Sequence, residues 1–474
     1  MKEELKVDLC IIGAGSGGLS VAAGASMMGA STVLIEKGKM GGDCLNYGCV
    51  PSKALLAAGH AADAVRRGGR FGISPNQPVV NGARAYGHVA DTIGAIAPHD
   101  SVERFEGLGV KVVQAEGRFD GPRTVEADGF RIQARRFVVA TGSRAFVPPI
   151  EGLNEVSFHT NESIFSLGAV PDHLIVIGGG PIGIEMAQAH RHLGARVTVL
   201  EMFSIMPKDD PELVDVLRKR LHEDGIDIRE GVTVAKVEKA GNGLVVTIEQ
   251  DGSDVRIEGS HLLVAAGRRP NVDGLGLETA GIAYSPQGIG VDNRLRTSNK
   301  KVFAIGDVAG SYQFTHVAGY HAGIVIRNAL FRLPAKASMA NVPWVTYTAP
   351  EVAQVGLTEQ QAQEQGVEFQ VLRWPFAEND RAQAEGETDG LVKVLVTPKG
   401  KILGAGIAGP HAGDLIQTWV LAMTGKLKIG AVAGMVAPYP TLGEVSKRAA
   451  GTFYTPKLFS ERTKKMVRFL AKFG

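Results

Sequence analysis

The chain has 474 residues, of which 44% are apolar and 21% charged, and its formal net charge at pH 7 is +2. A chain of this length divides on average into about three domains of roughly 150 residues, and this composition is typical of a soluble globular protein. The near-neutral charge excludes broad electrostatic attraction to nucleic acid, and no apolar run reaches the roughly 18 residues of a transmembrane helix.

The N-terminal residues enter a predicted strand directly, without the apolar region of a signal peptide. Three cysteines are too few for a framework of structural disulfides. We therefore expect a cytoplasmic protein, in which any disulfide serves catalysis.

The first motif is a glycine-rich turn at 13–18, which lies between a predicted strand at 7–12 and a predicted helix at 19–28. It reads Gly-Ala-Gly-Ser-Gly-Gly, and a second predicted strand, 31–35, ends at Glu36. Such glycines allow the backbone to approach a pyrophosphate, whose charge the helix N-terminus stabilises, while the acid binds a ribose diol. The complete strand–turn–helix context predicts dinucleotide binding rather than a merely tight turn.

A cysteine pair follows in the segment 41–53, which reads Gly-Gly-Asp-Cys-Leu-Asn-Tyr-Gly-Cys-Val-Pro-Ser-Lys. Cys44 and Cys49 can form a disulfide if the helical turn that holds them is distorted. The N-terminus of the helix predicted at 53–66 lowers the pKa of nearby thiols. A metal site needs three or four ligands, and the third cysteine, Cys10, lies in the first strand. A redox-active disulfide is therefore favoured over a metal site or two unconnected structural thiols.

The strand–turn–helix unit then recurs, with a predicted strand at 174–177, a glycine-rich turn at 178–183, a helix at 184–193 and a strand at 196–200 that ends at Glu201. Two dinucleotide folds in one chain indicate a bound flavin and an exchangeable nicotinamide. A carboxylate at this strand end accepts a hydrogen bond from a free 2′-hydroxyl and repels a 2′-phosphate, so NADH is favoured over NADPH. If the carboxylate pointed to solvent, either nucleotide could bind.

Three further predicted strands end in small residues, where a cofactor or a crossing chain would pass close to the backbone. They are the segments 137–142, 262–267 and 302–307. The last one ends in Gly306-Asp307, which places a carboxylate to accept a hydrogen bond from a ribityl hydroxyl of flavin. A plain turn is the alternative, and the first dinucleotide fold makes it the less favoured one.

The cysteine segment, the two glycine-rich turns, 267–271 (Gly-Arg-Arg-Pro-Asn) and 304–307 (Ala-Ile-Gly-Asp) together resemble the class I pyridine nucleotide–disulfide oxidoreductases. The resemblance covers essentially the whole chain, and the family includes dihydrolipoamide dehydrogenase, glutathione reductase and mercuric reductase. It implies an α/β fold with two Rossmann-like dinucleotide-binding domains, for FAD and NAD, and a C-terminal α+β dimerisation domain. The implied boundaries are 1–148 and 270–340 for the two parts of the FAD-binding domain, 149–269 for the NAD(P)H-binding domain, and 341–474 for the interface domain with its basic C-terminal helix.

The resemblance also implies roles for individual residues. Cys44 is expected to be the interchange thiol that meets substrate, and Cys49 the charge-transfer thiol against the flavin ring. Lys53 is expected near flavin N5, paired with Glu185, although a solvated helix lysine is the alternative. The residues expected to contact FAD are Gly13, Gly15, Gly18, Glu36, Lys37, Gly42, Asp43, Thr141, Gly142, Asp307 and Ala318. Those expected to contact NAD are Gly178, Gly180, Gly183, Glu201 and Gly267. No metal site is expected.

The interface domain departs from the family signature His-Pro-Thr-x-x-Glu, in which the histidine is the acid–base group for the thiols. Residues 438–444 read Pro-Tyr-Pro-Thr-Leu-Gly-Glu, so Tyr439 stands in the place of the histidine and Glu444 is retained. A phenol with an ordinary pKa of about 10 is a poor base at neutral pH. Tyrosine here resembles mercuric reductase, as does 314–321 (Phe-Thr-His-Val-Ala-Gly-Tyr-His), but no cysteine follows Cys49, so Hg(II) cannot be delivered through thiols of the tail.

We therefore predict a homodimeric enzyme in which a hydride passes from NADH to FAD and electrons then pass to the Cys44–Cys49 disulfide. The final acceptor is a small molecule or metal ion: a disulfide, a metal ion or a quinone. The alternative enzyme is a dihydrolipoamide dehydrogenase with a substituted acid. The alternative of another class is a slow-turnover flavin redox sensor or scaffold, against which the retained Lys53, Glu185 and thiols argue.

Residues 460–473 are predicted to form a short basic amphipathic helix. Its apolar residues recur at helical spacing among five cations. One interpretation is peripheral contact with an anionic membrane surface or with a membrane partner. The favoured alternative is packing against the dimer core with the cations in solvent. The apolar residues are Met466, Phe469, Leu470 and Phe473.

Overall fold

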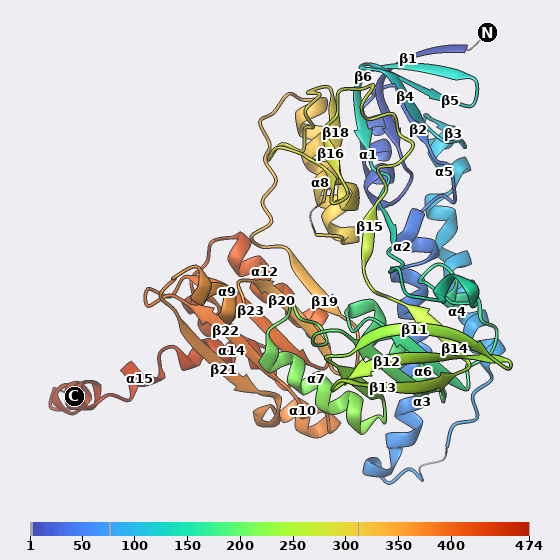
Figure 1. Cartoon of the computed structure of the whole chain (residues 1–474). Helices are drawn as coiled ribbons and strands as arrows, with labels where there is room; N and C mark the ends of the chain where they lie inside the picture. The colour runs from blue at the N-terminus through green and yellow to red at the C-terminus, as the bar shows by residue number, and fades with distance from the viewer. Residues whose placement is uncertain (1–2, 75–76, 311, 474) are drawn as a thin grey trace. The chain divides into compact units, whose positions relative to one another are not determined.

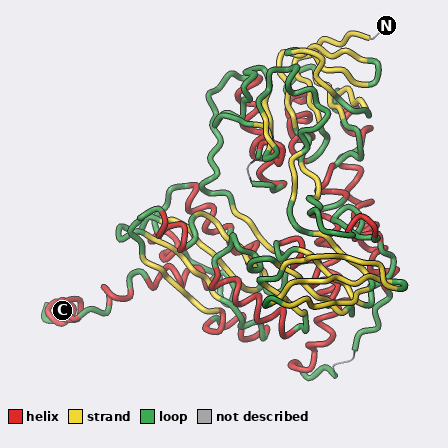
Figure 2. Tube along the Cα trace, viewed as in Figure 1, coloured by secondary structure: helices red, strands yellow, loops and turns green. Residues whose placement is uncertain are grey.

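The computed structural model describes residues 3–74, 77–310 and 312–473. The chain divides into two compact units, each built from segments that are separated in the sequence. The first unit comprises Met1–Asp63, Pro78–Met202 and Gly231–Ser338, and the second comprises Ala64–Gln77, Phe203–Glu230 and Met339–Gly474. Both units contain helices and strands (Figure 2). The four domain segments proposed above stay a prediction, since these units follow packing rather than those boundaries.

The first unit contains a sheet with a parallel centre, which leads into the first glycine-rich turn (Figure 1). Its strand order is β3-β2-β1-β6-β5-β4, and β18 pairs with β6. The strands are β1 (Glu3–Ile12), β2 (Thr32–Ile35), β3 (Val110–Val113), β4 (Arg118–Gly121), β5 (Thr124–Ala127), β6 (Phe130–Val139) and β18 (Val302–Ala304). The predicted start of β1 at residue 7 was wrong, because the strand already pairs with β6 at Glu3.

Side chains of β1 alternate between two hydrophobic cores, as the period of a strand requires. Leu9 and Ile11 belong to the core formed with buried residues of α1 (Ser16–Met27) and α8 (Thr315–Ala329), which pack against each other. Cys10 and Ile12 belong to the core on the other face. A strand that is buried on both faces reads as a continuous apolar run. Four more helices begin in the segments before residue 110 of this unit: α2 (Gly42–Asn46), α3 (Cys49–Arg67), α4 (Gly82–Ile96) and α5 (Val102–Gly107).

A second parallel sheet, with the order β9-β8-β14, leads into the second glycine-rich turn. Its strands are β8 (His173–Ile177), β9 (Arg196–Glu201) and β14 (His261–Val264), and α6 (Pro181–Leu193) packs on β8 and β9. An antiparallel sheet follows, made of β11 (Thr233–Ala240), β12 (Gly243–Gln250) and β13 (Ser253–Gly259). Short antiparallel ladders join β7 (Ser143–Ala145) to β15 (Arg268–Pro270) and β16 (Tyr284–Ser285) to β17 (Gly288–Ile289).

The second unit is organised around an antiparallel sheet with the order β19-β20-β23-β22-β21. These strands are β19 (Pro343–Thr346), β20 (Glu351–Gly356), β21 (Gln370–Pro375), β22 (Leu391–Val396) and β23 (Ile402–Gly409). The unit also contains β10 (Asp227–Glu230), α7 (Pro211–Glu223), α9 (Glu359–Glu364), α10 (Asp380–Glu385), α11 (Ala412–Leu415), α12 (Gln417–Thr424), α13 (Ile429–Gly434), α14 (Glu444–Thr452), α15 (Thr455–Leu458) and α16 (Glu461–Leu470). α14 packs on β21 and β22, and α7 packs on β20 and β23. None of the helices within the described residues is long and apolar enough to span a bilayer.

Candidate active site

The first glycine-rich turn has backbone geometry that side chains would obstruct. Gly13 has a φ of +106°, and a Cβ there would lie 2.4 Å from the carbonyl oxygen of Ala140. A Cβ at Gly18 would lie 1.8 Å from the carbonyl oxygen of Gly13. At Gly15, by contrast, the nearest heavy atom to an added Cβ would be 3.9 Å away, and no side chain caps the first turn of α1. The N-terminus of α1 is therefore open to an anion, as the pyrophosphate of FAD requires.

The second glycine-rich turn repeats this geometry. Gly178 has a φ of +113°, and a Cβ there would lie 2.4 Å from the carbonyl oxygen of Ala265. A Cβ at Gly183 would lie 2.0 Å from the carbonyl oxygen of Gly178. Nothing lies within 4 Å of a Cβ placed on Gly180, which precedes α6. The residues at both turns thus fit a dinucleotide pyrophosphate.

Each turn is closed by the acid at the end of the following strand. Glu36 Oε2 accepts a hydrogen bond from the N–H of Ala14 at 2.6 Å, and its Oε1 accepts one from Gly38 at 2.7 Å. Glu201 Oε2 accepts a hydrogen bond from the N–H of Gly179 at 2.6 Å. Both carboxylates therefore point to their own turn rather than to solvent, where a ribose diol of the bound nucleotide is expected.

Cys44 and Cys49 lie on two consecutive short helical segments, because α2 ends at Asn46 and α3 begins at Cys49. The predicted start of that helix at residue 53 was therefore wrong by one turn. Gly48 lies in the break, and a Cβ there would be only 2.8 Å from Asp43 Oδ2. Both cysteines are free thiols, Cys49 exposed and Cys44 half-buried. Each thiol shifts the pKa of the other, which implies the proximity that a reversible disulfide needs.

The two thiols have opposite acidities. The hydrogen bond from Cys44 lowers the pKa of Cys49 to about 6, against the effect of burial, and a hydrogen bond from Thr315 and the charge of Lys53 lower it further. The same interaction with Cys49, together with burial, raises the pKa of Cys44. In the dithiol form, the pair therefore holds its proton on Cys44 and its negative charge on Cys49.

Lys53 is held by a buried carboxylate on another helix. Its Nζ lies 2.8 Å from Oε2 of Glu185 in α6, and Glu185 is only 4% exposed. Lys53 also donates a hydrogen bond to Ser52 Oγ at 3.3 Å. The ion pair fixes the position of a cation one helical turn after Cys49 on α3.

Several residues outside the predicted set also hold the thiol segment. Thr315 Oγ1 at the start of α8 lies 3.3 Å from Cys49 Sγ, and it also hydrogen-bonds to Cys44. Asp43 accepts hydrogen bonds at Oδ1 from Asn161, at 3.0 Å, and forms an ion pair of 3.0 Å with Arg268. Arg268 and Thr315 lie in segments that the sequence singles out, 267–271 and 314–321, whereas Asn161 has no sequence signal.

Three more residues that were predicted to contact FAD each interact with a side chain or a backbone group of the first unit. Asp307 accepts a hydrogen bond from Ser143 at 2.5 Å, and burial raises the pKa of its carboxyl. Thr141 donates a hydrogen bond to the carbonyl oxygen of Asn271 at 2.8 Å. Lys37 is 69% exposed and forms an ion pair with Glu116 at 3.5 Å.

The other predicted glycines and Ala318 line the two turns and the strand ends. A Cβ on Gly42 would lie 2.7 Å from Gly15 Cα. Ala318 of α8 lies 3.2 Å from a Cβ placed on Gly306. Gly142 and Gly267 have φ values of +66° and +123°, which favour glycine.

Tyr439 and Glu444 belong to the second unit, whereas the group around the thiols belongs to the first. Tyr439 is 71% exposed, and its hydroxyl donates a hydrogen bond to Asp380 Oδ2 at 2.9 Å. This hydrogen bond raises the pKa of the phenol, since the carboxylate opposes its ionisation. Glu444 begins α14. At neutral pH Tyr439 is thus ionised even less often than an ordinary phenol, so it is less available as a proton acceptor.

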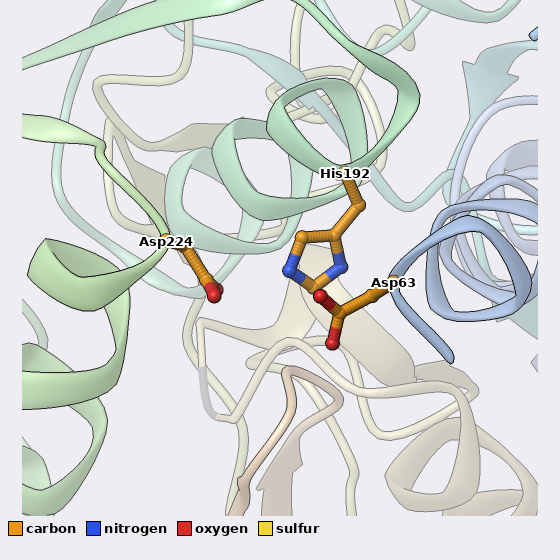
Figure 3. A group of neighbouring side chains, drawn as sticks. All are labelled: Asp63, His192 and Asp224. Carbon is orange, nitrogen blue, oxygen red and sulfur yellow. The ribbon is translucent and has the colours of Figure 1, made fainter. Parts of the chain in front are cut away.

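Asp63 of α3 and His192 of α6 form a second polar group in the first unit, in which ligand atoms lie within 4.8 Å of one another (Figure 3). Figure 3 also draws Asp224, which belongs to the second unit and is not counted with this pair. Two side chains provide fewer ligands than a structural metal site requires.

Comparisons with known proteins agree on the relatives of this chain. The model of the pyridine nucleotide-disulphide oxidoreductase family matches residues 7–322, and that of its dimerisation domain matches 342–450. A mercuric reductase of Bacillus cereus is 37% identical over 94% of this chain and 71% of its own length. A dihydrolipoyl dehydrogenase of Geobacillus stearothermophilus is 35% identical over 94% of this chain and 96% of its own length.

Two solved structures have similar folds along almost their whole length. LpdA of Mycobacterium tuberculosis has a TM-score of 0.86 at 27% identity, covering 94% of this chain and 99% of that one. A Cu(II) complex of the HOCl-induced flavoprotein disulfide reductase RclA of Escherichia coli has a TM-score of 0.84 at 26% identity, covering 93% of this chain and 99% of that one.

Proposed function

Because this chain belongs to the pyridine nucleotide–disulfide oxidoreductase family, we propose that it moves electrons from a reduced nicotinamide through FAD and the Cys44/Cys49 pair to an external acceptor. The family, the α/β fold class and the activity class predicted from the sequence, an FAD-dependent oxidoreductase, are confirmed. The acceptor and the roles of individual residues are proposals.

The opposite acidities of the two thiols are the observation that carries this proposal. Bound FAD supplies the two-electron chemistry, between the nicotinamide hydride and the disulfide. Two electrons and one proton convert the Cys44–Cys49 disulfide into one thiol and one thiolate, and the pKa values favour the thiolate on Cys49. Cys44 holds the proton in this reduced state. After Cys44 loses that proton, its thiolate reacts with the acceptor. Lys53, fixed by Glu185, adds a positive charge beside the thiolate.

We propose NADH rather than NADPH as the electron donor. Glu201 already points to the second turn, where it can accept a hydrogen bond from a free 2′-hydroxyl. A 2′-phosphate would meet a carboxylate in the same place, which is unfavourable at close range.

We propose that the electrons pass to a mercuric-reductase-like acceptor, such as a metal ion or a quinone, in preference to the disulfide of lipoamide. The weak basicity of Tyr439 supports this choice, because dithiol turnover needs a proton acceptor near neutral pH. Relatives named mercuric reductase and the Cu(II) complex of RclA support it as well. The lipoamide/dihydrolipoamide couple is the second candidate, which the relatives named dihydrolipoyl dehydrogenase favour.

The dimerisation domain supports a homodimer. We propose that Tyr439 and Glu444 of each chain complete the active site of the partner, as the family resemblance implies. We also place the enzyme in the cytoplasm, where a disulfide between Cys44 and Cys49 would be reduced and re-formed in each catalytic cycle rather than kept as a structural bond.

A steady-state panel with the purified FAD-loaded enzyme tests these proposals. Lipoamide, oxidised glutathione, Hg(II), Cu(II) and a soluble quinone are each supplied with NADH and then with NADPH. We expect NADH-dependent turnover of a metal ion or quinone to exceed that of lipoamide. Faster turnover of lipoamide would assign the protein to the dihydrolipoamide dehydrogenases instead, and slow reduction of the flavin by either nucleotide would favour the redox sensor.

A further inference from the structure

The C-terminal helix α16 is stabilised by its own side chains. Ser460 caps its N-terminus by accepting a hydrogen bond from the N–H of Thr463 at 3.3 Å. Glu461 in the first turn forms ion pairs with Lys464, at 2.9 Å, and with Arg468, at 3.8 Å. The helix follows α15 at the end of the red ribbon and stands away from the sheet of its unit (Figure 1). These local contacts stabilise the first turns of the helix.

One side of this helix is apolar and exposed. Five large apolar side chains lie along it, and at about 100° per residue all of them except Val467 fall within an arc of about 100° around the helix axis. Phe469 and Phe473 contact each other edge to face, with ring centroids 5.2 Å apart. A contiguous group of large exposed apolar side chains marks an interaction surface, whereas single ones do not. The set is Met466 (55% exposed), Val467 (57%), Phe469 (58%), Leu470 (56%) and Phe473 (75%).

The helix is also strongly cationic, and by the same spacing four of its five cations lie outside the apolar arc, whereas Arg462 falls within it. Between residues 461 and 473, five cations and one carboxylate give a formal charge of +4. The whole chain carries +2, so the rest of it carries +2 − 4 = −2. The positive charge of the protein is therefore concentrated on the helix that also exposes the apolar face. The cations are Arg462, Lys464, Lys465, Arg468 and Lys472.

We propose that α16 binds the surface of an anionic lipid bilayer. The apolar side chains would lie at the boundary between headgroups and acyl chains, while the lysines and arginines would meet lipid phosphates. Charge complementarity selects this occupant over a second copy of the chain, since the rest of the chain carries only a small excess of negative charge. Such binding would hold a reductase next to lipid-soluble acceptors, but it does not depend on which acceptor the enzyme uses.

The test is co-sedimentation of the full-length, FAD-loaded enzyme with lipid vesicles. Vesicles of phosphatidylcholine are compared with vesicles that contain about 30% phosphatidylglycerol, at low and high salt. We expect about tenfold stronger binding to the anionic vesicles, and loss of that difference at high salt, because each cation near the surface adds to the attraction and salt screens it.

Two double variants separate the contributions of the two sides. Phe469→Gln with Leu470→Gln removes apolar area, and Lys465→Glu with Lys472→Glu reverses charge; each should weaken binding to anionic vesicles by about tenfold or more. Lys399→Glu with Lys401→Glu is the matched control, because it makes the same charge change at exposed positions outside the tail and should bind like the parent. NADH oxidation in solution should be the same in all of them.

Three results would overturn the proposal. Equal binding of the parent to neutral and anionic vesicles would exclude recognition of charge, and equal binding of the tail variants and the parent would place the contact elsewhere. A change from dimer to monomer in the Phe469→Gln, Leu470→Gln variant, measured by analytical ultracentrifugation, would show that the apolar face packs against the second copy. None of these results bears on the electron pathway through Cys44 and Cys49.

Discussion

The thiol region of the first unit and the Tyr439 region of the second are held in very different ways. Cys49 contacts Cys44 and Thr315, and the nearby Lys53 is fixed by a carboxylate that is only 4% exposed. Tyr439 is 71% exposed and hydrogen-bonds to Asp380. The groups that would carry electrons are thus fixed by many contacts within their own unit. The group that would carry protons is an exposed side chain, so a substitution there should disturb the fold less. Changes in the first region should abolish the reaction, and changes in the second should alter which acceptor is used.

The largest effect is expected from the cysteine variants. Cys49→Ser should reduce turnover of the acceptor by about a thousandfold or more, because no disulfide can form. It should also abolish the long-wavelength absorption band that a thiolate gives beside bound flavin. Cys44→Ser is the matched control: turnover should fall equally, but the band should be present before NADH is added, since Cys49 keeps a hydrogen-bond donor beside it. Stopped-flow absorbance measures both.

The band distinguishes the roles of the two cysteines. If Cys44→Ser lacked the band and Cys49→Ser showed it, the assignments would be reversed. If neither variant lost turnover, the pair would not lie on the electron pathway.

The next largest effect is expected at the other region. Tyr439→His should raise turnover of lipoamide by about a hundredfold, because an imidazole can accept the thiol proton at neutral pH. Tyr439→Phe is the control, which removes the hydroxyl without supplying a base and should leave lipoamide turnover low. High lipoamide activity in the parent would mean that the site never lacked a base, and the argument from Tyr439 would then fail.

A smaller effect is expected at the second dinucleotide turn. Glu201→Ala should reduce the preference for NADH over NADPH, as the ratio of kcat/KM, by about tenfold, because it removes both the acceptor for the 2′-hydroxyl and the charge that repels a 2′-phosphate. Glu155→Gln changes the charge of an exposed residue of the same unit and should leave the ratio unaltered. An unchanged ratio in Glu201→Ala would mean that this carboxylate does not choose the nucleotide.

The parts of the site that were predictable are those that local chemistry determines. The glycine-rich turns could be predicted because a Cβ at Gly13 or Gly178 would meet a carbonyl oxygen at 2.4 Å, so few other sequences can form them. The contact between Asn161 and Asp43 joins residues 118 apart and depends on how the chain returns, which no local pattern encodes. The same holds for Thr315, whose hydroxyl reaches Cys49 across 266 residues.

Helix boundaries were a second limit. The predicted helix began at Lys53, where regular helical spacing begins, but α3 begins at Cys49. The break between α2 and α3 depends on the close approach of Gly48 to Asp43, which is a steric fact of the folded chain. Lys37 was predicted to contact FAD, and that role stays a prediction.

The smallest effect is expected from Thr315→Val, and it concerns the acidity of Cys49. The pKa of Cys49 beside Cys44 is lowered to about 6, so the thiolate band of the NADH-reduced parent should disappear on acidification with a midpoint near that pH. Removing the Thr315 hydroxyl should raise the midpoint by about one unit, which is the size expected when a thiolate loses one hydrogen bond. Ser16→Ala is the matched control, because it removes a hydrogen bond to Cys44 instead.

The same titration affects stability with a definite sign. The pKa of Cys49 in the folded dithiol enzyme lies below that of an unfolded thiol, about 8.5. Its ionisation therefore adds stability that is complete above that pH and is lost as the pH falls toward about 6. In Thr315→Val this stability should be lost at a higher pH than in the parent, so the pH range between the folded and unfolded pKa values of Cys49 becomes narrower. Thermal unfolding at several pH values would measure this. If the midpoint of the band and the pH at which stability is lost did not move together, the ionisation of Cys49 would not be the cause of both.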